Sequence, residues 1–135
     1  MVIEFKDASS PSENKAVDRI QVQEIGSSDF APLDSTGSTS LNDTESISIP
    51  LRTNSSTTSY KFVLTKDGTI NSDHIDFNYV LEEEYVSRAC GFRIIYNNLS
   101  FEQIAESTGT QWIQQAVVVL ENVTNNTDIH VQIFH

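Results

Sequence analysis

The sequence contains few of the residues that cross-link, break or anchor a chain. Its 135 residues include one cysteine, one methionine, one tryptophan and three prolines. A single cysteine excludes a disulfide framework within this chain and a zinc site built from paired cysteines. No apolar run approaches the length of a membrane-spanning helix. The opening residues, MVIEFKDASS, lack the basic start and apolar centre of a signal peptide.

Basic residues are also scarce. Eight Lys and Arg stand against nineteen Asp and Glu, so the formal net charge is −11 at pH 7. No Lys or Arg follows Arg93. Nucleic acids and anionic membrane surfaces are bound through clusters of basic side chains, and this chain has none, which excludes both as direct partners. An acidic excess of this kind is typical of a solvated surface rather than of a dedicated cation site.

Apolar residues recur at every second position along most of the chain, which is the period of a half-buried β-strand. Short β-branched runs such as AVVVL also favour strand over helix. Strands are therefore expected at residues 2–6, 16–25, 44–51, 58–65, 74–81, 89–97, 112–123 and 129–134. Asp67-Gly68 is typical of a tight hairpin turn. Helical spacing occurs only in residues 99–107, where Phe101, Ile104 and Ala105 predict one short helix.

Seven to nine short strands with at most one short helix predict an all-β fold. We expect a single domain over residues 1–135, folded as a two-sheet antiparallel β-sandwich of immunoglobulin-like or transthyretin-like type. A small β-barrel is the alternative. Residues 26–43 form the longest stretch of low hydrophobicity, and we expect a mobile surface loop there with Phe30 and Leu33 held against the core.

The only cysteine lies in an apolar run, VSRACGFRIIY, at residues 86–96. One phase of this run is the more apolar and is expected to face the core: Cys90, Phe92, Ile94 and Tyr96. A thiol on a core-facing phase behaves as a small hydrophobic group rather than as a nucleophile. Arg88 is expected at the mouth of this strand, near the glutamates at 82–84. We therefore expect no enzyme: no catalytic residue, no cofactor and no metal.

Metal and sugar sites have weak support in the sequence. His74 and Asp76 stand at i and i+2, which alone is a poor zinc pattern, and no acidic run matches a calcium-binding loop. Aromatic side chains can stack on a sugar ring, so Trp112 and Tyr85 are candidates for an aromatic ligand platform. The more common role of such rings is burial in the core.

Three segments carry a resemblance to a known family: IPLRTNSSTTSYKF at 49–62, EEYVSRACGFRIIYNNL at 83–99 and DIHVQIFH at 128–135. They resemble a family of small outer-membrane lipoproteins from Bacteroidota whose shared domain has no assigned function. The resemblance implies a signal peptide and a lipidated N-terminal segment with a second cysteine, both absent from the given residues. It implies a protein of the cell envelope, lipid-anchored to the outer membrane on its periplasmic or surface face.

The expected sandwich, its sheet edges, the missing catalytic residues and the implied lipid anchor together favour one role, and the resemblance suggests two modifications. The role is a non-enzymatic accessory or protein-interaction subunit of an outer-membrane assembly, with an outer-membrane or periplasmic protein as partner. A carbohydrate- or small-ligand-binding β-sandwich is the alternative. Cys90 becomes a candidate for a disulfide with the missing upstream cysteine. Ser35, in Asp34-Ser35-Thr36, resembles an O-glycosylation acceptor.

The implied disulfide can be tested at Cys90. In the oxidised, folded protein, a chain that carries the upstream segment should resist alkylation at Cys90, because a disulfide has no free thiol. The measurement is the mass shift after iodoacetamide treatment, with a reduced sample as the control. Equal alkylation with and without the upstream segment would contradict the disulfide.

Overall fold

The computed structural model describes residues 1–105 and 109–135, and every regular element in this part of the chain is a β-strand. The nine strands are β1 (Val2–Lys6), β2 (Val17–Glu24), β3 (Leu41–Thr44), β4 (Ser46–Ser48), β5 (Thr57–Lys66), β6 (Thr69–Ser87), β7 (Gly91–Ile104), β8 (Gln115–Val118) and β9 (Ile129–Phe134). The all-β prediction is confirmed. The helix expected over residues 99–107 is wrong as far as Ile104, because β7 continues there in register with β6. Residues 106 and 107 lie outside the described residues.

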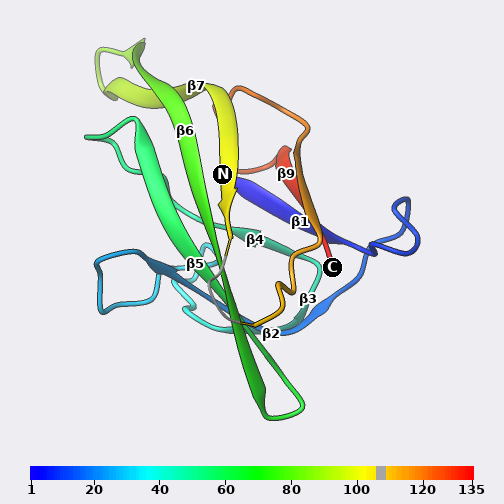
Figure 1. Ribbon diagram of the computed structural model, residues 1–135. Coiled ribbons are helices and arrows are strands. Elements are labelled where there is room, and N and C mark those ends of the chain that lie inside the picture. The colour runs from blue at the N-terminus through cyan, green and yellow to red at the C-terminus, as the bar shows by residue number, and fades with distance from the viewer. Residues whose placement is uncertain (106–108) are drawn as a thin grey trace.

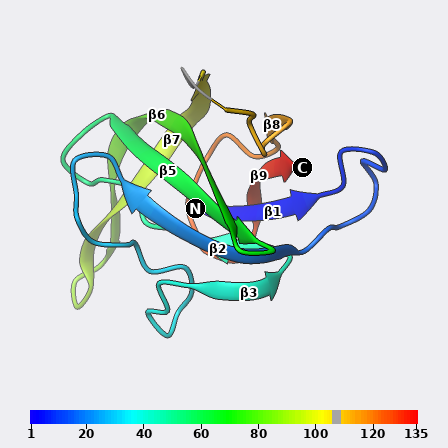
Figure 2. The same cartoon turned by 60° about the horizontal axis from the view of Figure 1, so that its bottom comes forward.

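The strands form two sheets that pack face to face, as the predicted sandwich requires. Sheet A has the order β4-β1-β9-β8, and sheet B has the order β3-β2-β5-β6-β7. Figures 1 and 2 show sheet B curling around sheet A. All neighbouring strands are antiparallel except β1 and β9, which pair in parallel at the centre of sheet A. The two ends of the sequence therefore meet in one sheet.

The core lies between the sheets and is built from the alternating faces that the sequence predicts. Fully buried apolar side chains come from both sheets: Ile3, Phe5, Val131 and Ile133 from sheet A, and Ile20, Val22, Phe62, Ile75 and Phe77 from sheet B. Leu33 is also buried, at 1% exposure, whereas Phe30 is 38% exposed, so its predicted contact with the core is wrong. Residues 26–43 include the start of β3 at Leu41, which the loop prediction missed.

The β5–β6 hairpin closes at the turn that the sequence predicts. Lys66 pairs with Thr69, and the two residues between them, Asp67 and Gly68, have φ angles of 52° and 76°. Positive φ at both central positions is the signature of a type I′ turn, whose twist matches that of the flanking strands. This tight turn sets the register of β6 against β5.

Strand β6 is much longer than its neighbour β5, with 19 residues against 10. The pairing of β5 with β6 ends where Thr57 meets Asn78, and beyond that point β7 alone pairs with β6. A bulge marks this point on β7, where Asn98 has a φ of 55°. Residues 80–97 thus form a two-stranded hairpin, here called the arm, which extends past β5 at the upper left of Figure 1.

Three tyrosine hydroxyls, two on buried rings and one on a half-buried ring, hold the chain at the base of the arm. They donate hydrogen bonds to three successive carbonyl oxygens: Tyr60 to Pro50 (2.7 Å), Tyr96 to Leu51 (3.1 Å) and Tyr79 to Arg52 (3.0 Å). Burial raises the pKa of each of these hydroxyls, so all three remain protonated donors. We call this group the tyrosine clamp. It holds residues 50–52 against the inner face of sheet B, so this segment does not run beside β6.

The central tyrosine of the clamp belongs to a closed set of hydrogen bonds. The Arg52 N–H donates to the Thr58 hydroxyl (2.9 Å), which lies 2.6 Å from the Tyr79 hydroxyl, and that hydroxyl donates back to the Arg52 carbonyl. Thr58 is 1% exposed and Tyr79 is 4% exposed, so water cannot easily replace a lost partner.

Removal of this hydroxyl should destabilise the domain. We expect Tyr79→Phe to lower the free energy of unfolding by about 1–3 kcal/mol, because buried polar groups at Thr58 and Arg52 lose a partner. The measurement is chemical denaturation of the whole domain. Tyr85→Phe is the matched control, since it removes a hydroxyl from an exposed ring and should change stability by less than about 0.5 kcal/mol. Equal effects of the two substitutions would contradict the clamp.

One buried histidine makes the fold sensitive to pH. His130 is fully buried on β9, and its Nδ1 accepts a hydrogen bond from the Val2 N–H at 3.0 Å. An accepting ring nitrogen carries no proton, so this imidazole is neutral. Burial, reinforced by the nearby Met1 amino group, lowers its pKa below the usual 6.5. At a pH between the lowered pKa and 6.5, the unfolded chain binds more protons at His130 than the folded chain does.

Stability should therefore fall as the pH decreases below about 6.5. His130→Asn keeps an acceptor near Val2 and removes the titration, so this variant should show a shallower loss of melting temperature between pH 7 and pH 5. The pKa values of His135 and of the Met1 amino group are also lowered by burial, and both groups remain in the variant, so part of the slope should persist. Identical pH profiles for the two proteins would contradict this assignment.

Candidate functional site

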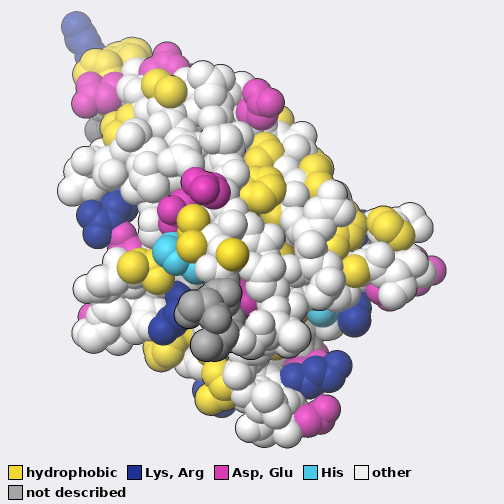
Figure 3. Space-filling model, viewed as in Figure 1, with side chains coloured by type: hydrophobic (Ala, Val, Ile, Leu, Met, Phe, Trp, Pro, Cys, Tyr) yellow, Lys and Arg dark blue, Asp and Glu magenta, His cyan; other side chains and the backbone are white. Residues whose placement is uncertain are grey.

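The outer end of the arm exposes large hydrophobic side chains. Tyr85 is 58% exposed, Phe92 is 65% exposed and Val86 is 49% exposed. Tyr85 and Phe92 are cross-strand partners whose ring centroids lie 5.6 Å apart in an edge-to-face arrangement. Figure 3 shows hydrophobic, acidic and basic side chains gathered at this end of the molecule. An exposed aromatic pair on a projecting hairpin is typical of a contact surface rather than of a core.

The structure of the arm differs from the prediction that residues 86–96, which contain Cys90, form a core-facing strand. Phe92, Ile94 and Tyr96 do share one face, as the phase predicts, but of the three only Tyr96 packs against the core. Cys90 is exposed in the turn before β7, not buried in a core strand. The reason is that β6 and β7 continue beyond the region that sheet A covers.

The exposed position of Cys90 is relevant to two hypotheses, a catalytic thiol and a disulfide with an upstream cysteine. Its backbone N–H donates to the Ser87 hydroxyl at 3.0 Å, and no hydrogen bond within residues 1–105 and 109–135 involves its thiol. A catalytic thiol needs a basic partner such as a histidine beside it, so the hypothesis of a catalytic Cys90 gains no support from these contacts. The disulfide with an upstream cysteine stays a prediction, and the exposed turn leaves the thiol accessible to a partner.

The three glutamates of the arm differ in their surroundings. Glu84 pairs with Arg93 directly across the hairpin at 2.6 Å, and Glu82 accepts a hydrogen bond from the Asn97 side chain. Glu83 has no ion-pair or hydrogen-bond partner among the described side chains. Arg88 lies in the turn at the mouth of β7, and the ion pair with Glu84 is made by Arg93.

One edge of the arm carries backbone groups that have no partner within residues 1–105 and 109–135. The Tyr79 N–H donates to the Ser56 carbonyl at 3.0 Å, and this is the last bond on the β5 side of β6 among the described residues. Hydrogen-bonding direction alternates along a strand, so Leu81, Glu83 and Tyr85 point their N–H and C=O groups to this same side. We call these three residues the open edge. The opposite edge is covered at its inner end only, where Tyr96 on β7 exchanges two hydrogen bonds with Val123.

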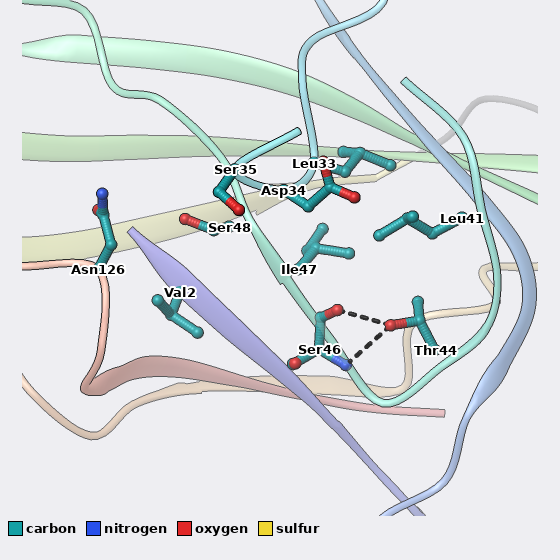
Figure 4. A pocket seen from close by; sticks show the side chains of 10 residues that line it. All are labelled: Val2, Leu33, Asp34, Ser35, Leu41, Thr44, Ser46, Ile47, Ser48 and Asn126. Atoms are coloured by element: carbon teal, nitrogen blue, oxygen red, sulfur yellow. Dashed lines mark hydrogen bonds between the residues drawn. The ribbon is translucent and has the colours of Figure 1, made fainter. Parts of the chain in front are cut away.

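A pocket of about 480 Å³ lies on another part of the surface, beside β4. Figure 4 shows an apolar floor of Val2, Leu33, Leu41 and Ile47 under a polar rim. Two rim groups are already engaged, since the Thr44 hydroxyl donates to the Ser46 carbonyl at 2.7 Å. No aromatic ring lines this pocket, so it has no stacking surface for a sugar.

Ser35 lies exposed at the rim of this pocket, next to a carboxylate that shapes the loop. One oxygen of Asp34 accepts hydrogen bonds from the Thr36 hydroxyl (2.7 Å), the Thr36 N–H (2.9 Å) and the Ser38 N–H (3.0 Å). These bonds, led by the Thr36 hydroxyl, lower the pKa of Asp34. Ser35 is thus accessible on an ordered turn, and its O-glycosylation stays a prediction.

The structure does not bring Trp112 and Tyr85 together. Trp112 is 8% exposed, and its indole N–H donates to the Phe62 carbonyl at 3.2 Å. The next residue is fixed as well, because the Ile113 N–H donates to the buried carboxylate of Asp73 at 2.7 Å. Trp112 therefore packs in the domain, whereas Tyr85 is exposed on the arm. The sequence gives Tyr85 as a candidate but does not identify its exposed partner Phe92.

The one residue pair that suggests a metal site in the sequence lies on β6. His74 and Asp76 form a partly buried pair at 2.6 Å on β6, which accounts for both side chains. Residues 1–105 and 109–135 contain no group of three His, Cys, Asp or Glu side chains placed to hold a metal ion. The same residues contain no helix long and apolar enough to cross a membrane.

Comparison with known proteins gives one match. Residues 25–135 match a protein family described as a family of unknown function (DUF6452). This match begins directly after β2 and includes the whole arm. Searches of curated proteins and of solved structures gave no match.

Proposed function

Since the chain belongs to the DUF6452 family of unknown function, we propose its role from its geometry. The domain is a non-enzymatic interaction module of the cell envelope that binds a partner protein through the arm. The exposed Tyr85–Phe92 pair at the end of the arm is the observation that supports this proposal most directly.

The composition of the arm supports protein binding. Tyrosine and phenylalanine are enriched at the centres of protein interfaces, and the arm presents Tyr85 and Phe92 as a contacting pair on one face, with Arg93 on the opposite face. The rings of Tyr85 and Phe92 contact each other across the two strands, so little side-chain freedom remains to be lost on binding. A hairpin that projects from a sandwich also reaches a surface that the body of the domain does not touch.

The location in the envelope is supported by the resemblance to lipid-anchored proteins of Bacteroidota. A lipid-anchored domain stays close to proteins of the same membrane, so weak contacts at the arm suffice for an assembly. The partner we propose is an outer-membrane or periplasmic protein. The ligand-binding alternative has less support, because Trp112 is buried and the pocket beside β4 lacks aromatic residues.

Photocrosslinking tests the proposal in the lipid-anchored, full-length protein. A benzoylphenylalanine placed at Phe92 should crosslink to one defined envelope protein in intact cells. The same group placed at Phe30, an exposed phenylalanine outside residues 80–97, is the matched control and should not crosslink to that protein. Crosslinking at Phe30 but not at Phe92 would contradict the proposal.

Substitutions at the arm give an independent prediction. Tyr85→Ser and Phe92→Ser should each weaken binding of the partner protein that crosslinking identifies by about thirtyfold, as expected for central aromatic residues of an interface. The measurement is recovery of that protein with each variant in the absence of a crosslinker. Both rings are exposed, so each variant should keep a melting temperature close to that of the parent domain. Unchanged recovery from variants that are still folded would contradict a role of these rings.

A further inference from the structure

We propose that the arm binds its partner by strand addition at the open edge. An extended segment of the partner pairs with Leu81, Glu83 and Tyr85, and it carries a basic residue opposite Glu83 between two apolar residues. This inference rests on the proposed function, because it specifies how the arm recognises a protein.

The backbone supplies the first argument. The open edge has three residues whose N–H and C=O groups point away from β7, and the described residues offer them no partner. The line of β5 stops at Ser56 because the tyrosine clamp holds residues 50–52 on the inner face of sheet B. A strand from another protein can therefore continue where β5 ends. Pairing of this kind is a common mode of peptide recognition.

The side chains of the open edge select the residues of the incoming strand. Leu81, Glu83 and Tyr85 lie on one face of the arm, each opposite an aromatic or aliphatic residue of β7: Tyr96, Ile94 and Phe92. Directly opposed side chains in a sheet stabilise each other when they are apolar pairs or opposite charges. The incoming strand thus matches best with apolar residues opposite Leu81 and Tyr85.

Glu83 defines the central position of this pattern. Its two neighbours in sequence already have partners within the arm, Arg93 for Glu84 and Asn97 for Glu82. Glu83 alone among the three has none within the described part of the chain. A lysine or arginine opposite Glu83 would supply the missing charge.

Charge also excludes a second copy of this chain as the occupant. Antiparallel pairing of two open edges about Glu83 would place Glu83 opposite Glu83 and Glu82 opposite Glu84. Like charges directly opposite each other destabilise a sheet, and here three such pairs would coincide. The glutamates thus prevent self-association of an exposed edge while leaving it open to a basic strand.

A synthetic peptide tests this inference on the intact domain. The probe is the acetylated, amidated peptide TVTKTVT, which in an extended form places valine, lysine and valine on one face. Titration into the ¹⁵N-labelled domain should shift the amide signals of Leu81, Glu83 and Tyr85 and slow their hydrogen exchange. Absence of these shifts up to about 5 mM peptide, or shifts centred on β4 or β8, would overturn the proposal.

Peptide variants separate strand pairing from simple charge attraction. N-methylation of the lysine removes a donor that faces the open edge and should weaken binding at least tenfold, whereas N-methylation of a threonine beside it, whose N–H faces away, should change binding less than about twofold. Equal effects of the two modifications would overturn strand addition.

Protein variants test the central charge. Glu83→Lys should weaken binding of TVTKTVT by about tenfold and should favour the variant peptide TVTETVT instead. Glu82→Lys makes the same change in net charge on the opposite face of the arm, so it should leave the preference for the lysine peptide intact. Equal effects of both substitutions would overturn the assignment of Glu83.

The outcomes separate this inference from the proposed function. Persistent crosslinking at Phe92, together with failure of the peptide tests, would overturn strand addition and leave the interaction role in place. Loss of specific crosslinking at Phe92 would overturn the interaction role itself.

Discussion

The arrangement of this domain depends on the hydrogen bonds between three tyrosine hydroxyls of sheet B and the carbonyl groups of residues 50–52. These bonds draw the chain that precedes β5 onto the inner face of sheet B. Without them the same segment would be free to extend along β6 and complete a third strand of the arm. The clamp thus closes one end of the sandwich and leaves the outer half of the hairpin two strands wide.

A two-stranded hairpin with an aromatic end is costly to keep in water, and its features fit a surface that another protein covers. The Glu84–Arg93 pair and the Tyr85–Phe92 contact hold the two strands together without help from the core. Glutamates beside the open edge would oppose the pairing of this edge with a second copy of the chain. Rigidity, exposure and protection against self-association therefore occur in the same few residues.

The alternation of side chains was enough to predict which face of each strand is buried, as Ile3 and Phe5 or Ile75 and Phe77 show. It was not enough to predict where a strand leaves the core. Tyr85 and Phe92 continue the same period as the buried residues, and they are exposed because β6 and β7 continue beyond the region that sheet A covers. The spacing of Phe101 and Ile104 predicted a helix, but pairing with β6 determined the conformation instead. The sequence therefore predicted only one residue of the site, Tyr85. The exposure of the site depends on how strands that are distant in the sequence are arranged, and alternation within one strand does not reveal this.

The parallel pairing of β1 with β9 has a consequence for the order of events during synthesis. Sheet A has these two strands at its centre, and they lie at opposite ends of the sequence. A nascent chain cannot complete this sheet until Phe134 has left the ribosome, and contacts of such long sequence separation form slowly. Until then the inner face of β1 remains exposed. The fold thus defers its own completion until nearly the whole domain has been synthesised.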